Sequence, residues 1–289
     1  MEHSAKEKVF KYQGLGNDFV LLDRRSTARD IEAATARWLC DRRRGVGADG
    51  VLVLLPSRAA AARLMVHNAD GSTAETCGNG LRCAAKYLAD RSGQKPPRLR
   101  LETDTGTVDC QLTYRGDWVD EVQVSMGPAK LLADQLPSRE GGTPFVHREL
   151  AGFPGVRGTA ISIGNPHLIL FGTPLEDAGR IGPRLERDPL FPERTNVGFA
   201  NLEGEVIRLR VWERGAGLTE ACGSGACAAV AAAIVEKRLT PGTWVRVELP
   251  GGALQIRCEP DFSNVEMRGP ARFVFEASLS IDASPETAD

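Results

Sequence analysis

The chain has 289 residues, of which 42% are hydrophobic and 26% charged, a balance typical of a soluble globular protein with one or two domains. Its net charge of −2 gives no reason to expect a nucleic-acid partner or an acidic membrane surface. The N-terminus lacks the apolar segment of a signal peptide, and the longest apolar run, residues 226–235, is much shorter than the roughly 20 residues of a membrane span. We therefore expect a cytoplasmic protein with no nucleic-acid and no membrane partner.

In the first half of the chain, residues 50–55 have the pattern of a strand. A glycine-rich turn, CGNG at 77–80, follows and leads into an expected helix. Two strand-like segments, 98–103 and 106–113, come next. The basic run at 42–44 is expected to be solvated. The helix is indicated by an apolar stripe at the three-to-four spacing of one helix face: Leu81, Ala84, Ala85 and Leu88.

The second half repeats this order. Strand-like segments occur at 160–163, 167–171 and 206–211, and the turn CGSG at 222–225 follows them. Residues 226–235 are apolar on every side, which predicts a buried helix. Further strands are expected at 243–248 and 253–258.

Three features recur in the same order at a separation of about 145 residues, which indicates an internal duplication. CGNG is repeated as CGSG, GNDF (16–19) as GNPH (164–167), and ETDTG (102–106) more loosely as ELPGG (248–252). A helix surrounded by strands in each half predicts an α+β fold of two pseudo-symmetric lobes, each a mixed β-sheet wrapped around a central buried helix.

We expect residues 1–124 to form the first lobe, completed by 270–289, and residues 125–269 to form the second. The expected active site lies in the cleft between the lobes, where the two repeated cysteine turns would meet.

The seven cysteines include no C-x-x-C pair, so neither a metal site nor a disulfide framework is expected. Cys77 and Cys222 differ from the others because each stands before a glycine at the start of an expected helix. A helix N-terminus favours a thiolate, and its exposed N–H groups can hold a carboxylate. Two such units facing each other would place one sulfur on either side of a substrate carbon, as a racemase that uses two bases and no cofactor requires.

The segment GVGADG (45–50) matches the spacing of a dinucleotide-binding loop. Such a loop should follow a strand and open a helix, whereas this one precedes a strand-like segment. We therefore expect no nicotinamide or flavin cofactor.

Several long segments resemble the diaminopimelate epimerase family. They are GLGNDFVLLD (14–23), GVGADG (45–50), NADGSTAETCGNGLRC (68–83), GNPH (164–167), RTNVGFA (194–200) and VWERGAGLTEACGSGACA (211–228). The resemblance implies reversible interconversion of LL- and meso-2,6-diaminopimelate, in lysine and peptidoglycan precursor biosynthesis. It also implies a homodimer.

The resemblance assigns roles to particular residues. Cys77 and Cys222 match the acid–base pair, and His167 and Glu213 match residues that assist it. The residues expected to bind substrate are Asn17, Asn68, Gly78, Asn79, Asn165, Asn196, Glu213, Arg214, Gly223 and Ser224.

The chain departs from the family pattern at Gly50, where many members have glutamine, so Gly50 is left out of the expected site. From the residues alone, three asparagines could instead be caps or turn residues, and His167 could be a structural histidine. These asparagines are Asn17, Asn68 and Asn196.

Two other functions stay open at this point. The first is a racemase of proline, hydroxyproline or histidine on the same scaffold, although Glu213 and Arg214 favour a substrate with a second charged end. The second is a thiol redox switch in which Cys77 and Cys222 form a reversible disulfide. The near-identity of the two turns gives no basis for deciding which cysteine is the resting thiolate.

Overall fold

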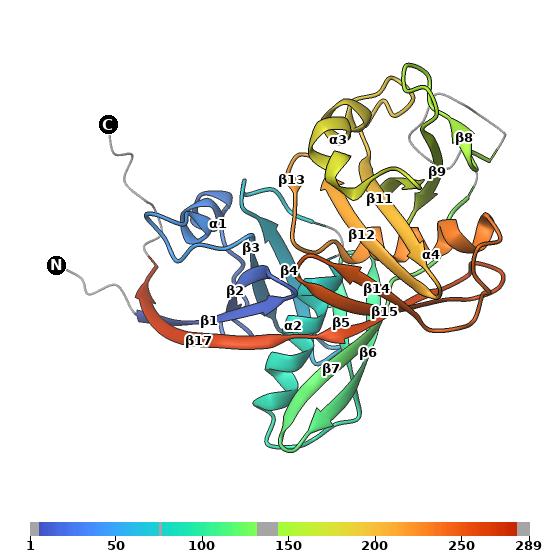
Figure 1. The fold of residues 1–289 in the computed structure, drawn as a ribbon. Coiled ribbons are helices and arrows are strands. Elements are labelled where there is room, and N and C mark those ends of the chain that lie inside the picture. Colours follow the sequence, from blue (N-terminus) through green and yellow to red (C-terminus); the bar gives the residue numbers. More distant parts are fainter. Residues whose placement is uncertain (1–5, 75–76, 132–143, 282–289) are drawn as a thin grey trace, which may run out of the picture. The chain divides into compact units, whose positions relative to one another are not determined.

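The computed structural model describes residues 6–74, 77–131 and 144–281. The chain divides into two compact units, which we call unit 1 (residues 1–124 and 269–289) and unit 2 (residues 125–268). Figure 1 colours the elements in chain order.

The described part of unit 1 contains the α-helices α1 (Ala33–Cys40) and α2 (Gly78–Asp90). Its strands are β1 (Lys6–Gly14), β2 (Asn17–Asp23), β3 (Gly50–Leu55), β4 (Ala62–Asn68), β5 (Arg98–Thr103), β6 (Gly106–Arg115), β7 (Trp118–Ser125) and β17 (Arg272–Ser280).

Unit 2 has the helices α3 (Ala178–Glu186) and α4 (Gly223–Val235) and a short 3₁₀ helix, η2 (Leu175–Asp177). Its strands are β8 (Arg148–Glu149), β9 (Arg157–Ser162), β10 (Pro166–Phe171), β11 (Asn196–Glu203), β12 (Val206–Glu213), β13 (Gly217–Leu218), β14 (Val245–Leu249), β15 (Gly252–Cys258) and β16 (Val265–Pro270).

The strand pairings repeat between the units. From β1 to β7, successive strands pair antiparallel, parallel, antiparallel, parallel, antiparallel and antiparallel. The series β9, β10, β11, β12, β14, β15, β16 follows the same sequence of pairings. In both series the cysteine-led helix lies between the fourth and fifth strands of the chain order. The predicted α+β class, with a duplicated mixed sheet, is confirmed.

Each cysteine-led helix is the centre of its own unit. Helix α2 contacts β1 to β6 and β17, and α4 contacts β9 to β12 and β15. Strands on several sides leave α4 no polar face, which is why its sequence after Ser224 is almost entirely alanine, valine and isoleucine.

Helix α2 is buried more completely than its apolar stripe indicates. Residues Gly78–Ala89 are all buried, including Arg82 and Lys86. Lys86 forms an ion pair of 2.8 Å with Asp90, one helical turn away, and the Arg82 guanidinium donates to the carbonyl of Pro270 at 3.2 Å. The face of α2 that looks polar in the sequence is therefore buried too. Its charged side chains have partners in the fold, because burying an unpaired charge costs free energy.

The remaining helices cover apolar clusters on the sheets. Helix α1 contributes Ala36 and Leu39 to a core with Val20, Val51 and Val53 of unit 1. Helix α3 contributes Ala178, Ile181 and Leu185 to a core of unit 2 that includes Leu168 and Phe199. Within the described residues, no helix combines the length and apolar character needed to cross a membrane.

Candidate active site

Cys77 and Cys222 are the N-cap residues of α2 and α4. Their backbones are extended and nearly identical, with φ/ψ of −133°/103° at Cys77 and −124°/105° at Cys222. In each case the sulfur accepts the backbone N–H three residues later, from Gly80 or Gly225, at 3.4 Å. A cysteine sulfur therefore takes the capping role that a serine or aspartate oxygen usually fills.

The glycines that follow each cysteine allow tight packing at the start of the helix. A Cβ on Gly80 would lie 2.9 Å from Leu52 Cδ2, and one on Gly225 would lie 3.0 Å from Val211 Cγ2. The first N–H groups of a helix have no acceptor within it. Those of Gly78, Asn79, Gly223 and Ser224 stand at these two ends, where the partial positive charge favours an anion.

The two cysteines differ in their surroundings. Cys77 is half-buried, whereas Cys222 is 4% exposed. Burial raises the pKa of the Cys222 thiol well above its ordinary value, and the adjacent Glu213 carboxylate raises it further. Hydrogen bonds from Ser224 and the N–H of Gly225 oppose this without outweighing it. The lowered thiol pKa expected at a helix N-terminus is therefore not found at Cys222, because burial and the Glu213 carboxylate outweigh the donors that favour the thiolate.

In unit 1, Asn17 and Asn79 are joined by their side chains. Asn79 Nδ2 donates to Asn17 Oδ1 at 3.0 Å, and Asn17 Nδ2 donates to Asp49 Oδ2 at 2.9 Å. Asn17 begins β2 directly after a hairpin turn in which Leu15 and Gly16 both have positive φ, 57° and 82°. This turn carries Asn17 back toward the start of α2.

In unit 2, the corresponding contact joins Asn165 to Ser224. Asn165 Nδ2 is 3.5 Å from Ser224 Oγ, which is in turn 3.6 Å from the Cys222 sulfur. Asn165 Oδ1 lies 3.0 Å from His167 Nε2. A hydrogen-bonded series therefore runs from His167 through Asn165 and Ser224 to Cys222.

His167 is fully buried on β10, and burial, together with the positive charge of Arg214, lowers its pKa to about 3. The imidazole is therefore neutral at pH 7. Because Nε2 faces the carbonyl oxygen of Asn165, that nitrogen carries the proton. Nδ1 then has a lone pair, and it has no hydrogen-bond partner among the described residues.

Glu213 ends β12, and its Oε1 accepts the Thr219 hydroxyl at 2.5 Å. The Arg214 backbone N–H donates to Asn196 Oδ1 at 3.0 Å, while Asn196 Nδ2 donates to the Pro166 carbonyl at 2.9 Å. Through these two hydrogen bonds Asn196, which is 4% exposed, joins the Arg214 turn to the start of β10. The exposed Arg214 guanidinium donates to the carbonyl of Glu193 at 3.0 Å.

Glu186, at the end of α3, supports the same turn. It is 3% exposed, and its carboxylate accepts the Trp212 indole N–H at 2.8 Å and the Gly215 N–H at 3.1 Å. Burial raises the pKa of this carboxyl, but these two donors and nearby arginines bring it below its usual value. Glu186 therefore holds the residues on both sides of Glu213 and Arg214.

Asn68 lies at the exposed end of β4, in unit 1, where its side chain donates to Ser72 Oγ at 3.0 Å. The Gly71 N–H donates to the Asn68 carbonyl, and Gly71 has a φ of 85°. Asn68 is thus part of a tight turn, as its sequence context also allowed.

The GVGADG segment leads into β3, which begins at Gly50, and opens no helix. A Cβ on Gly50 would lie 2.7 Å from the carbonyl oxygen of His67. Glycine is therefore required at this position by the close approach of β4.

The expected site residues fall into two groups. Unit 1 holds Cys77, Gly78, Asn79, Asn17 and Asn68, and unit 2 holds Cys222, Gly223, Ser224, Asn165, His167, Asn196, Glu213 and Arg214. Three supporting residues were missed by the sequence analysis: Asp49, Glu186 and Thr219. Asp49 and Thr219 stand inside the matching segments, which is a signal that could have been used. Among the described residues, no cluster of three or more His, Cys, Asp and Glu side chains is arranged to hold a metal.

Comparison with known proteins gives the same family as the sequence motifs described above. The family model described as diaminopimelate epimerase matches residues 9–132 and 159–274. A diaminopimelate epimerase of Synechococcus sp. (strain JA-3-3Ab) is 47% identical, covering 93% of this chain and 97% of the relative. One from Desulfitobacterium hafniense is 43% identical, covering 96% of this chain and 99% of the relative.

Solved structures share the fold at low identity. A hydroxyproline epimerase from Agrobacterium vitis superposes with a TM-score of 0.73 at 16% identity, covering 99% of this chain and 94% of the other. A PhzF-family phenazine biosynthesis protein from Bacillus anthracis gives 0.71 at 17% identity, covering 95% and 99%. At these identities the likeness concerns the fold alone. The family match and the curated relatives, which extend over most of the sequence, show that the chain belongs to the diaminopimelate epimerase family of isomerases.

Proposed function

We propose that this protein interconverts LL- and meso-2,6-diaminopimelate, without a cofactor, at a site formed by the N-termini of α2 and α4. The observation that carries the proposal is the duplicated cysteine cap in a chain of this family: each helix begins with a sulfur beside N–H groups that have no acceptor within the helix. The carboxylate at the reacting carbon would be held by the N–H groups of Gly78, Asn79, Gly223 and Ser224. This reaction belongs to lysine and peptidoglycan precursor biosynthesis.

In the proposed reaction, one cysteine thiolate removes the proton from the α-carbon. The electron pair of the broken C–H bond moves into the carboxylate, giving an enediolate that the helix N–H groups stabilise. The thiol on the other side then gives its proton to the carbon. One sulfur gains a proton and the other loses one, so the enzyme's total number of protons is unchanged.

The raised pKa of Cys222 supports its assignment as the thiol of the resting enzyme. Cys77 is then the thiolate that removes the first proton in one direction. In the other direction, Cys222 must first give up its proton, and the Glu213 carboxylate beside it is the acceptor available. The neutral His167 is joined to Cys222 through Asn165 and Ser224, and we propose that it assists the reaction by orienting these groups.

The residues at the end of β12 and of β4 are proposed to bind the distal amino-acid end of the substrate. The Arg214 guanidinium has the geometry to bind a carboxylate through two parallel hydrogen bonds, and Glu213 can pair with an ammonium group. Asn68, Asn165 and Asn196 complete this group, with Asn196 acting mainly on the Arg214 backbone.

The experiment that tests the function incubates the protein with LL-diaminopimelate in deuterated water, with no added cofactor. We expect meso-diaminopimelate carrying deuterium at one α-carbon, detected by mass spectrometry and chiral chromatography. Proline, trans-4-hydroxyproline and histidine serve as parallel substrates. Racemisation of one of these, with diaminopimelate unchanged, would contradict the proposal.

We further propose that the protein is a cytoplasmic homodimer. The support for a dimer is a group of large apolar side chains exposed in unit 1: Phe273 (45%), Val274 (53%) and Phe275 (41%) on β17, and Trp118 (64%) on β7. Sedimentation velocity of the protein and of a Phe273→Glu variant tests this. A monomer at all concentrations would exclude it.

A further inference from the structure

The GVGADG segment, which the proposed function leaves without a role, supplies a carboxylate to the site. We propose that Asp49 is a positioning residue that sets the orientation of two successive carboxamides, Asn17 and Asn79, and so makes Asn79 present a hydrogen-bond acceptor at the start of α2. The inference rests on the proposed function for what that acceptor binds.

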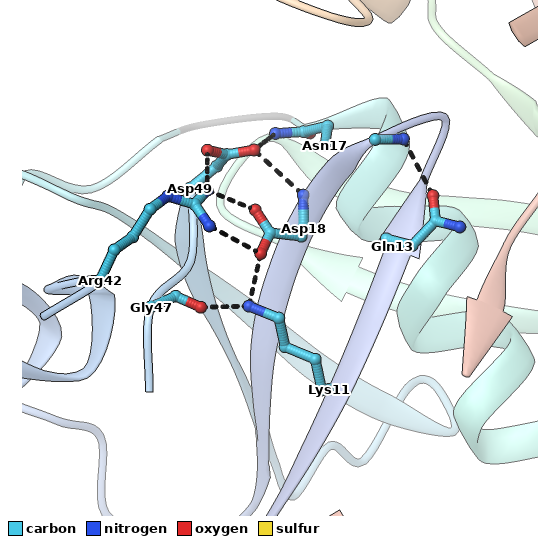
Figure 2. Close-up of polar contacts among 8 residues, drawn as sticks. Lys11, Gln13, Asn17, Asp18, Arg42, Gly47 and Asp49 are labelled. Atoms are coloured by element: carbon cyan, nitrogen blue, oxygen red, sulfur yellow. Dashed lines mark hydrogen bonds and ion pairs between the residues drawn. The ribbon is translucent and has the colours of Figure 1, made fainter. Parts of the chain in front are cut away.

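Asp49 is held by a charged network that Figure 2 shows. Arg42 donates to Asp49 Oδ1 at 2.8 Å and to Asp18 Oδ1 at 2.7 Å. Lys11 forms an ion pair with Asp18 and also donates to the Gly47 carbonyl. Asp49 Oδ2 accepts the backbone N–H of Asp18 at 3.0 Å. The predicted solvated arginine run thus includes one arginine, Arg42, that is exposed but fixed by two carboxylates.

The charges in this network favour the ionised form of Asp18. Burial raises the pKa of Asp18, but hydrogen bonds from Arg42 and Lys11 bring it below its ordinary value. Gly47 has a φ of 80°, and a Cβ there would lie 3.0 Å from the Arg42 Cα. The glycine therefore lets the loop close against Arg42, which brings Asp49 to Asn17.

An ionised carboxylate can only accept hydrogen bonds. The atom of Asn17 that lies 2.9 Å from Asp49 Oδ2 must therefore be Nδ2, which leaves Oδ1 on the other side of the carboxamide. Oδ1 in turn requires a donor, so Asn79 must offer its Nδ2 at 3.0 Å. The charge on Asp49 thus determines the orientation of both amides.

With this orientation, the side-chain oxygen of Asn79 lacks a hydrogen-bond donor. Asn79 is 4% exposed, and its Oδ1 has no hydrogen-bond partner among the described residues. A buried, unsatisfied oxygen costs free energy unless a ligand provides the donor. In an amino-acid substrate whose carboxylate lies at the neighbouring N–H groups, that donor is the ammonium on the reacting carbon.

The test uses Asp49→Asn, which keeps the shape of the side chain and can donate as well as accept. Asp49→Glu is the conservative variant. The matched control is Asp109→Asn, which changes an exposed carboxylate on β6 that pairs with Arg100 of β5. The Asp49 and Arg42 side chains are 43% and 58% exposed, so loss of the ion pair itself should change stability little. Thermal unfolding of each variant checks this.

The first readout needs no activity. In ¹H–¹⁵N spectra of ligand-free protein with labelled asparagine, the Asn17 side-chain amide is identified by its loss in Asn17→Ala. We expect one Asn17 proton to exchange slowly with water in the wild type and in Asp49→Glu, and rapidly in Asp49→Asn. An unchanged Asn17 amide in Asp49→Asn would overturn the proposal.

The second readout is the rate of diaminopimelate epimerisation. We expect Asp49→Asn to lower kcat/KM about tenfold and Asp109→Asn to leave it unchanged. In an Asn17→Ala background, Asp49→Asn should cost less than about twofold, because Asp49 acts through Asn17. An equal loss in both backgrounds would overturn the proposal. A protein that does not epimerise diaminopimelate would refute the proposed function, while the amide spectra would still decide the role of Asp49.

Discussion

The N-termini of α2 and α4 have the same local structure and different surroundings. Their N-cap dihedral angles agree within about ten degrees, and both sulfurs accept an N–H at 3.4 Å. Yet Cys77 is half-buried, whereas Cys222 is enclosed beside a carboxylate that raises its pKa. A duplicated motif has therefore kept its backbone geometry while the residues around it have diverged.

The divergence extends to the direction of the hydrogen bonds. At α2, Asn79 donates to Asn17, which donates to Asp49. At α4, His167 faces the carbonyl oxygen of Asn165, whose amide faces Ser224. The two carboxamides occupy matching places in the repeat but point in opposite senses, because one is paired with a carboxylate and the other with an imidazole N–H. Such a difference fits the opposite protonation states proposed above for the two cysteines.

The largest effect is expected when either cysteine is removed. Cys77→Ala and Cys222→Ala should each lower epimerisation at least about a thousandfold, since proton transfer to or from one side of the carbon is lost. Cys83→Ala and Cys227→Ala, buried in the same two helices, are the controls and should retain most activity. Chiral chromatography of the products measures the rates. A substantial rate in either site variant would show that the two helix ends do not act as a pair.

A smaller effect is expected at Glu186, which supports unit 2 only. Glu186→Gln replaces an oxygen with an NH₂ group that cannot accept from both Trp212 and Gly215. We expect the free energy of unfolding to fall by about 1–3 kcal/mol and KM to rise about tenfold as the Arg214 turn loosens, with kcat affected less. Glu176→Gln, an exposed neighbour on η2, provides the control. A fall in kcat with unchanged KM would show that Glu186 acts on the chemistry instead of on the turn.

The smallest effect concerns the chemical difference between the two thiols. Because the pKa of Cys222 is raised, only a small fraction of it is thiolate at pH 8, and Glu213→Gln should increase that fraction by removing a negative charge. We expect alkylation of Cys222 by iodoacetamide to become about three to ten times faster, and that of Cys77 to change less. Peptide mass spectrometry follows both sites. Equal acceleration at both cysteines would mean that Glu213 does not distinguish them.

Much of the fold could be predicted from residue patterns. The apolar run at 226–235 predicts the buried helix α4, which begins at Gly223. The strand segments end within two residues of the observed strands, except that segment 160–163 misses the first three residues of β9. The apolar stripe of α2 predicted the burial of this helix less well, because charged residues such as Arg82 and Lys86 normally indicate a solvent-exposed face, whereas here they are buried. Their partners include Pro270, far along the chain, and no local pattern indicates such a contact.

For the site, the repeated C-G-x-G turns alone indicate two cysteine-capped helix ends, because capping and the need for glycine depend on a few consecutive residues. The surroundings of each thiol and the orientation of each amide were decided by tertiary structure. Asp49 reaches Asn17 across 32 positions of sequence, and the pKa of Cys222 depends on burial by the strands around α4 and on Glu213. Desolvation and charge act through space, so two nearly identical turns became two different chemical environments.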